Sequence, residues 1–306
     1  MARIHTWPAA QEPASSVQTT PPLFSLRTDL AYDEGVKRAA VGIILVFGFA
    51  PACARRAGAG ARAGQDETAP PVAITANRSW EIKHDGARDG LTVATGTWPG
   101  HPFWMVTDLG VDLSRIRIEI AARAGGASLF QLLPKGALAI VNGGYFRPDF
   151  RPTGWVRSED KDLSPKSPST RGGVFGISAA GDVFIGPLPA LPFVPRLAIQ
   201  NFPLVVEAGS VSGIHSDDGH RAARTVLCIA NAKLHILVVG GAGGDGPTLF
   251  EVAEHLRAPA PGGLGCTEAL NLDGGPSTGV AFASGIDAPS REALAPVGYG
   301  LALFSK

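Results

Sequence analysis

The sequence predicts an α+β fold, built as a single domain of short, largely antiparallel strands with few helices. Among the 306 residues, 39 are Gly and 25 are Pro, which favours frequent turns between short strands. Residues 114–120 read Ser-Arg-Ile-Arg-Ile-Glu-Ile, and this alternation of polar and apolar side chains is typical of a half-exposed strand. Sheets with one face toward solvent are usually antiparallel, so both observations indicate this fold class.

Residues 1–78 are expected to precede the domain. A basic stretch, Val36-Lys37-Arg38, comes before the apolar run 39–50, and Ala52-Cys53-Ala54 follows, which is the pattern of a secretory signal. Cleavage after Ala54 and lipid attachment at Cys53 both remain open. We therefore expect export to the periplasm, cell envelope or extracellular space. The predicted parts are an N-terminal extension and signal at 1–54, a flexible tether at 55–78 and the folded domain at 79–306.

The composition narrows the classes of partner. Lys plus Arg total 27 and Asp plus Glu total 27, so no overall field draws the chain to nucleic acid. With 45% hydrophobic and 18% charged residues, the chain is expected to bury a core. We expect a glycan or sugar-phosphodiester substrate, no nucleic acid, and membrane contact only through a lipid at Cys53. The sequence carries no signal for an oligomeric state.

Several elements can be placed along the domain by their local patterns. We expect a short helix at 129–133, a buried strand at 137–141 and a polar, proline-bearing surface loop at 147–169. Turn residues predict two hairpins, centred on Ala180-Gly181 and Asn231-Ala232. These hairpins agree with the predicted antiparallel sheet.

Two further features lie in the second half of the chain. Pro203 falls inside the apolar run 197–206 and rules out a regular central strand there, since proline cannot donate to a sheet ladder. Thr248 and Glu251 have the spacing of a capping box, and the apolar residues that follow share one helical face. This segment is the one convincing helix of the sequence.

Cys228 and Cys266 are the cysteines of the predicted domain, and both lie in apolar, strand-like surroundings. In an exported protein they could form a disulfide, or they could remain two buried thiols that pack as small apolar side chains. Sequence spacing does not decide between these alternatives, because pairing depends on the distance in space.

The most informative stretch is 267–280, Thr-Glu-Ala-Leu-Asn-Leu-Asp-Gly-Gly-Pro-Ser-Thr-Gly-Val. An apolar strand ends at Asp273, and Gly274-Gly275 would let backbone N–H groups turn toward an anion or a sugar oxygen. Asn142-Gly143-Gly144 follows the strand at 137–141 in the same way. For an isolated Asp-Gly-Gly, the competing interpretation is an Asx turn within its own loop.

Two other motifs predict ligands less convincingly. Residues 241–246, Gly-Ala-Gly-Gly-Asp-Gly, match a dinucleotide-binding fingerprint, but Pro247 follows at once and too few residues come after Asp273 to complete such a fold. Residues 215–220 group two histidines and two aspartates, which could ligate a divalent ion, although Asp-Gly is also an ordinary solvated turn. We therefore predict no metal and no cofactor.

Five segments, in order, resemble motifs of the phosphodiester glycosidase family, which includes the mannose 6-phosphate uncovering enzyme and bacterial envelope proteins. The likeness covers roughly residues 110–304, and five ordered motifs are more specific than any single one. The segments are Asn142–Phe146 (N-G-G-F-F in the family), Gln200–Val206 (Q-x-G-P-x-L-V), Arg224-Thr225 (R-T), Thr248–Leu256 (T-L-x-E-x-A-x-x-L) and Asn271–Thr278 (N-L-D-G-G-G-S-T).

The resemblance implies hydrolysis of a sugar-1-phosphodiester, which releases a free sugar and leaves the phosphate on its partner. It also implies that the motif residues line one surface cavity. Two positions depart from the motifs: Phe202 replaces a small glycine, and Pro276 replaces the third glycine of the anion loop. The sugar and the phosphate partner are therefore not assigned by the resemblance.

The leading hypothesis is an exported glycosidase that acts on a glycosyl phosphodiester in an envelope or extracellular glycan, such as an exopolysaccharide. Asp273 would act on the anomeric carbon or its water, and the guanidinium of Arg224 would grip two phosphate oxygens. Nearby carboxylates at Glu159, Asp160 and Glu207 match no motif position, so one carboxylate is expected to suffice. The expected substrate-binding residues are Asn142, Gly143, Gly144, Gln200, Thr225, Asn271, Gly274, Gly275, Ser277 and Thr278.

Alternatives accompany these assignments. Arg224 could instead form a surface ion pair with Asp217 or Asp218, and Asn142 and Asn271 could merely cap turns. At the level of the whole protein, the second hypothesis is a non-catalytic glycan-binding or polysaccharide-assembly protein that uses the same cavity.

Overall fold

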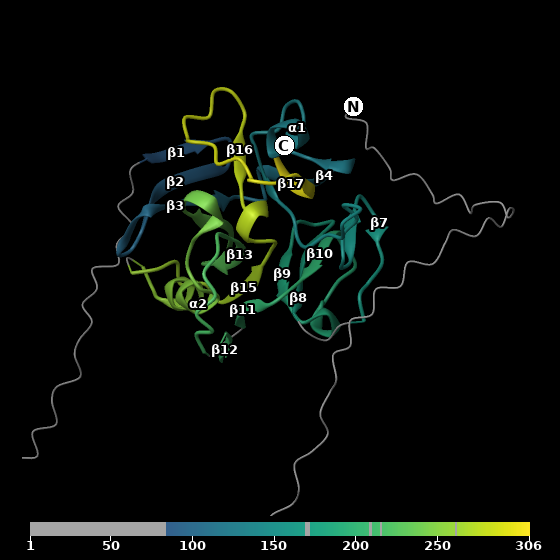
Figure 1. The fold of residues 1–306 in the computed structure, drawn as a ribbon. Helices are drawn as coiled ribbons and strands as arrows, with labels where there is room; N and C mark the ends of the chain where they lie inside the picture. The colour runs from purple at the N-terminus through teal and green to yellow at the C-terminus, as the bar shows by residue number, and fades with distance from the viewer. Residues whose placement is uncertain (1–83, 169–171, 208–209, 215, 261) are drawn as a thin grey trace, which may run out of the picture. The chain divides into compact units, whose positions relative to one another are not determined.

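A computed structural model of the chain describes residues 84–306 except 169–171, 208–209, 215 and 261. The predicted signal, Cys53, the tether and the domain start at Ser79 lie outside the described residues. Within them, every strand pairing is antiparallel, and only two α-helices accompany the strands (Figure 1). The expected short antiparallel strands with few helices are thus confirmed. Neither described helix is long and apolar enough to cross a membrane.

The largest sheet has eight strands and carries most of the segments that matter for the site. Its central strands are neighbours through long antiparallel ladders, which align the ends of segments far apart in sequence. In spatial order the strands are β1 (His84–Arg88), β2 (Leu91–Trp98), β3 (His101–Val111), β14 (Lys233–Gly240), β13 (Arg224–Ala230), β15 (Glu268–Asn271), β11 (Leu204–Glu207) and β12 (Ser210–Gly213).

Two smaller sheets complete the strand framework. The five-stranded sheet has the order β7 (Lys161–Ser164), β6 (Val156–Ser158), β10 (Pro195–Asn201), β8 (Gly173–Ser178) and β9 (Val183–Gly186). The four-stranded sheet has the order β16 (Val280–Phe282), β5 (Ala139–Asn142), β17 (Val297–Ser305) and β4 (Ile116–Ala127). The helices are α1 (Leu129–Leu132), α2 (Leu249–Arg257) and the 3₁₀ turns η1 (Leu188–Ala190), η2 (Ala242–Gly244) and η3 (Gly275–Ser277).

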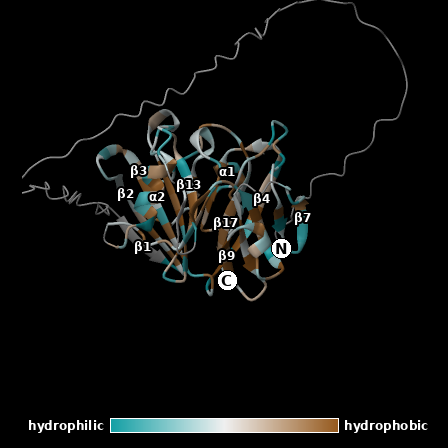
Figure 2. Ribbon diagram, turned by 90° about the horizontal axis from the view of Figure 1, so that it is seen from below, coloured by the Kyte–Doolittle hydropathy of each residue, from teal (hydrophilic) through white to brown (hydrophobic). Residues whose placement is uncertain are grey.

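The core lies between the three sheets, each of which contributes apolar side chains to it. Side chains alternate along β13: Leu227 faces this shared core, whereas Val226 and Cys228 face a second cluster on the other side of the sheet. The helix α2 covers that second cluster with Val252 and Leu256. Because both faces of the central strands are covered, they are largely hydrophobic, as the brown strands of Figure 2 show.

Several local expectations are confirmed. Thr248 and Glu251 form the predicted capping box at the start of α2, with both reciprocal bonds present. Asn231 and Ala232 adopt positive φ values of 49° and 58° and turn the chain from β13 into β14, as the hairpin required. Pro203 interrupts the apolar run as expected, since β10 belongs to the five-stranded sheet and β11 to the eight-stranded one.

The predicted surface loop at 147–169 is wrong, because the hairpin β6–β7 lies within it. Glu159 and Asp160 form its tight turn, with φ of 49° and 64°. These two strands are short and rich in polar residues, so the sequence shows no apolar alternation there. The hairpin is held instead by Asp162, which accepts from the Trp155 indole at 2.8 Å and from Arg157 at 3.0 Å.

Cys228 and Cys266 form a disulfide, which resolves the alternative left open by the sequence. Their Cα atoms lie 5.8 Å apart, and both side chains belong to the cluster beneath α2. The bond joins β13 to the segment that leads into β15. It therefore ties together the two strands that carry Arg224 and Asp273.

Candidate functional site

The ends of three strands, β13, β15 and β5, meet at one edge of the sheets. Because β13 and β15 pair with Val226 opposite Asn271, Arg224 and Asp273 come to lie across from each other at the strand ends. The Gly275 N–H continues this contact by donating to the Ala223 carbonyl at 2.7 Å. The Asp273 N–H donates to the Gly143 carbonyl at 3.1 Å, which brings in the end of β5. The segments predicted from motifs are thus neighbours in space.

Asn142 is fully buried and has all its amide partners within the protein. Its Nδ2 donates to the carbonyl oxygens of Gly143 at 3.1 Å and Asp273 at 2.8 Å. Its Oδ1 accepts from the Thr225 hydroxyl at 2.7 Å and the Gly279 N–H at 3.1 Å. We expected Asn142 to fix a sugar hydroxyl and Thr225 to bind substrate; in the structure their side chains bond each other, and Asn142 holds the loop of Asp273.

Three of the four glycines allow close packing, and Gly275 allows a positive φ of 58°, whereas we had expected all four to bind an anion. A Cβ on Gly143 would come within 2.3 Å of the Tyr299 ring, and one on Gly274 within 2.8 Å of the Ala223 carbonyl oxygen. The N–H groups already have partners: Gly143 donates to the Tyr299 carbonyl at 2.9 Å and Gly274 to Asp273 Oδ1 at 2.9 Å. The Gly144 N–H bonds the Tyr299 hydroxyl. The N–H groups of all four glycines, Gly275 included, are therefore already bonded within the protein.

Asp273 combines the two interpretations that the sequence left open. Its Oδ1 accepts from the Gly274 N–H, as an Asx-type loop would have it, yet the side chain remains partly accessible. Burial raises the pKa of Asp273, and the bonds from the Ser277 hydroxyl and the Gly274 N–H oppose that rise only in part. A carboxylate with a raised pKa accepts a proton more readily, which suits a general base.

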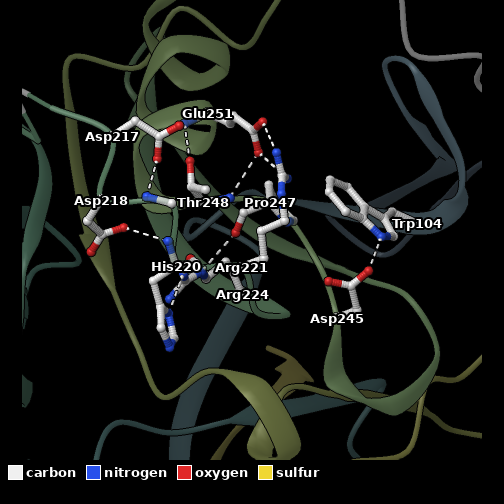
Figure 3. Close-up of polar contacts among 11 residues, drawn as sticks. Trp104, Asp217, Asp218, His220, Arg221, Arg224, Asp245, Pro247, Thr248 and Glu251 are labelled. Atoms are coloured by element: carbon white, nitrogen blue, oxygen red, sulfur yellow. Dashed lines mark hydrogen bonds and ion pairs between the residues drawn. The ribbon is translucent and has the colours of Figure 1, made fainter.

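Arg224 is only 7% exposed and is held by main-chain oxygens. Its Nε donates to the Pro247 carbonyl at 3.1 Å and its Nη2 to the His220 carbonyl at 2.6 Å (Figure 3). The Nε and Nη2 nitrogens are thus occupied, whereas Nη1, near Gly274, has no hydrogen-bond partner among the described residues and is the nitrogen that can meet a phosphate oxygen. Neither Asp217 nor Asp218 forms an ion pair with Arg224 among the described residues, although Asp218 acts on it through its charge.

Tyr145 is a site residue whose role the motif reading missed. Burial and the charge of Asp273 raise the pKa of its phenol, while Arg224 and a bond from Asn271 oppose the rise. The charges of both predicted catalytic groups therefore act on the Tyr145 hydroxyl, which stays protonated at neutral pH. Its ring packs against Phe202 with centroids 4.9 Å apart.

The remaining predicted residues support the site from within. Gln200 holds the main chain at Ser167. Its Oε1 accepts from the Ser167 N–H at 2.8 Å, and its Nε2 donates to the Ser167 carbonyl at 3.0 Å. Asn271 donates to the Tyr145 hydroxyl at 3.2 Å, and Asn201, which the sequence reading passed over, donates to the Asn271 carbonyl at 2.6 Å. Thr278 is buried, and its Oγ1 has no hydrogen-bond partner among the described residues.

The described part of the histidine–aspartate segment, 216–220, lies beside Arg224, whereas His215 lies outside the described residues. Asp217 and Asp218 cap their own loop, accepting from the N–H groups of Gly219 and His220 (Figure 3). His220 also places its Nδ1 3.5 Å from Arg224 Nη2. Within the part of the chain that the structure describes, no three His, Cys, Asp or Glu side chains group as metal ligands.

The dinucleotide interpretation of 241–246 finds no support. Asp245 accepts from the Trp104 indole at 3.0 Å, and Gly244 accepts from the Ala223 N–H at 2.6 Å, so the loop packs on the start of β13. The neighbouring ladders are antiparallel, whereas the dinucleotide fold needs adjacent parallel strands. A cavity of about 850 Å³ lies at the opposite ends of these strands, where Lys233, Glu207 and Glu268 line it, and it contains none of the predicted site residues.

Comparisons with known proteins identify the family and a similar fold. Residues 135–304 match the phosphodiester glycosidase family. The catalytic domain of zebrafish N-acetylglucosamine-1-phosphodiester alpha-N-acetylglucosaminidase, auto-inhibited by its pro-peptide, is similar in fold, with 18% identity and a TM-score of 0.54 over 74% of this chain and 87% of that one. A hypothetical protein from Synechocystis has 15% identity and a TM-score of 0.52 over 71% of this chain and 62% of that one. No curated protein matches the chain.

The matched region includes every segment that meets at the site, from the end of β5 to the loop after β15. It covers more than half of the 306 residues. The fold, the ordered motifs and this match agree, and the chain belongs to the phosphodiester glycosidase family.

Proposed function

We propose that this protein is an exported hydrolase that cleaves the anomeric C–O bond of a glycosyl phosphodiester in an envelope or extracellular glycan and releases the free sugar. The observation that carries the proposal is the β13–β15 register, which brings the start of β13 at Arg224 to the loop of Asp273, with the charges of both residues acting on the Tyr145 hydroxyl. A base and a fixed positive charge in one site are what the displacement of a phosphate from a sugar requires.

In the proposed reaction, water attacks the anomeric carbon and gives its proton to the Asp273 carboxylate. The electron pair of the broken C–O bond goes to the phosphate oxygen, so the products are a free sugar and a phosphomonoester. Arg224 Nη1 faces the growing negative charge, and its guanidinium is held in place by two main-chain carbonyls. Because these bonds exist before substrate binds, no reorganisation is needed as charge develops.

One carboxylate suffices in this scheme. An ordinary glycoside releases a basic alkoxide and needs a general acid, whereas a phosphate leaves as a stable anion. The other carboxylates near the motifs have different surroundings: Asp160 and Glu159 face Arg157 and Arg196 in the β6–β7 turn, and Glu207 lines the distant cavity. They are not part of the proposed chemistry.

The test is to incubate the purified protein with a panel of sugar-1-phosphodiesters and measure the reducing sugar released. Turnover by the parent, and none by Asp273→Asn, is the expected result. Affinity for these compounds without release of sugar would instead favour the glycan-binding alternative. Export is tested separately, by fractionating the producing cells and determining the N-terminal residue of the mature protein.

A further inference from the structure

Phe202 is a large apolar side chain that is exposed to solvent. Its side chain is 51% exposed, although it follows the buried strand β10 and precedes β11. Its ring is not isolated, because it packs on Tyr145 at 4.9 Å with the planes tilted by 46°. Together the two rings present an aromatic surface beside the segment that leads to Asp273.

The pair is anchored to the site by a single amide. Asn271 Nδ2 lies 3.2 Å from both the Tyr145 hydroxyl and the Phe202 carbonyl, and 2.6 Å from the Leu272 carbonyl, so its two hydrogens serve three acceptors. From the other side, Asn201 Oδ1 accepts from the Tyr145 N–H at 3.2 Å. The two rings therefore have a fixed position with respect to Asp273, two residues beyond Asn271.

We propose that Phe202 and Tyr145 form the sugar subsite of this chain and select a pyranosyl ring that presents its apolar C–H face. This inference rests on the proposed function, because it assigns the sugar side of the same site.

The chemistry of the two side chains supports different contacts. The face of an aromatic ring carries partial negative charge, which attracts the weakly positive C–H groups of a sugar and excludes water from them. The Tyr145 oxygen already accepts from Asn271, and its own hydrogen has no acceptor among the described residues. That hydrogen is available to a sugar oxygen near the anomeric carbon.

Binding is measured by calorimetry with two phosphonates that cannot be hydrolysed. One is the monomethyl ester of α-glucopyranosylmethylphosphonate, and the other is monomethyl ethylphosphonate, which carries the same anion without a sugar ring. We expect Phe202→Ala to weaken the first about tenfold, or about 1.4 kcal/mol, and to leave the second unchanged. Tyr145→Phe should weaken the first about threefold to tenfold through the lost hydrogen bond.

The matched control is Phe130→Ala, since Phe130 is similarly exposed at 53% but lies in α1. Melting temperatures should stay at the parent value for all three variants. The proposal is overturned if Phe202→Ala binds the glucosyl ligand as the parent does, if it loses both ligands equally, or if the parent shows no preference for the ring.

The two proposals fail separately. Phe202-dependent binding without hydrolysis of any glycosyl phosphodiester would leave the subsite standing and end the hydrolase proposal. Hydrolysis by the parent with unchanged kcat/KM in Phe202→Ala across several sugars would do the reverse.

Discussion

Replacing Asn142 by Ala should destabilise the fold more than it weakens any ligand. The substitution removes a side chain with four hydrogen bonds from a fully buried position. Gly143 keeps another donor at its carbonyl, the Asp273 N–H. The Thr225 hydroxyl, the Gly279 N–H and the Asp273 carbonyl lose the bonds that Asn142 makes with them.

A buried polar group left unpaired costs roughly 1–3 kcal/mol, and at the lower part of that range the three together predict a loss of about 3–5 kcal/mol in the free energy of unfolding. For a domain of this size, a loss of that magnitude lowers the melting temperature by roughly 6–20 °C. Urea unfolding followed by tryptophan fluorescence measures the change. Thr225→Val is the matched control, because it removes one of the four bonds and should cost about 1–2 kcal/mol.

The reasoning is refuted if Asn142→Ala unfolds within about 1 kcal/mol of the parent, since a buried network cannot lose three partners at so small a cost. Parent-like stability together with lost sugar affinity would return Asn142 to the ligand-binding role that the motif suggested. A double-mutant cycle with Thr225→Val measures the coupling between the two side chains directly.

Four further predictions concern the charged groups and the disulfide. Because burial raises the pKa of Asp273, kcat/KM should fall as pH drops through a midpoint above the ordinary value of 3.8, and Asp273→Asn should abolish turnover. The same shift means that ionising Asp273 costs stability at neutral pH, so Asp273→Asn should melt at or above the parent temperature at pH 7. This gain should vanish below pH 3.8, where Asp273 is protonated in both the folded and the unfolded chain. A variant that melts well below the parent at pH 7 would contradict the reasoning. Arg224→Ala should lower kcat/KM by about 10²–10³, as loss of a key donor does. The variants Glu159→Gln, Asp160→Gln and Glu207→Gln should each change kcat/KM less than about threefold. If one of these three lowers kcat/KM as much as Arg224→Ala does, a second carboxylate takes part in the reaction. Reducing the Cys228–Cys266 bond, which spans 38 positions, should cost about 3–4 kcal/mol by the loop-entropy relation, and unchanged unfolding after complete reduction, checked by thiol titration, would disprove it.

The sequence predicted the elements that depend on neighbouring residues. The capping box at Thr248, the hairpin turn at Asn231-Ala232 and the break at Pro203 each follow from bonds or torsion angles within a few residues. The strand at Ile116 was found because one face is polar and the other apolar. The hairpin β6–β7 was missed because its stability comes from polar contacts between side chains, which leave no apolar period in the sequence.

The candidate site, too, was only partly predictable from the sequence. Ordered motifs marked the segments of Asn142, Arg224 and Asp273, but a motif names residue types and does not show which way a side chain points. Only the folded chain showed that Asn142 faces inward to hold the Asp273 loop, and that Arg224 spends two of its three nitrogens on main-chain carbonyls.

The sequence by itself therefore determined the strand-rich class, the family and the segments that carry the site, because each is written in local patterns or in ordered motifs. The tertiary structure decided the disulfide, the roles of the glycines and the meeting of Tyr145 with Phe202. These depend on distances between segments that are far apart along the chain, and such distances are set only when the three sheets pack around their common core.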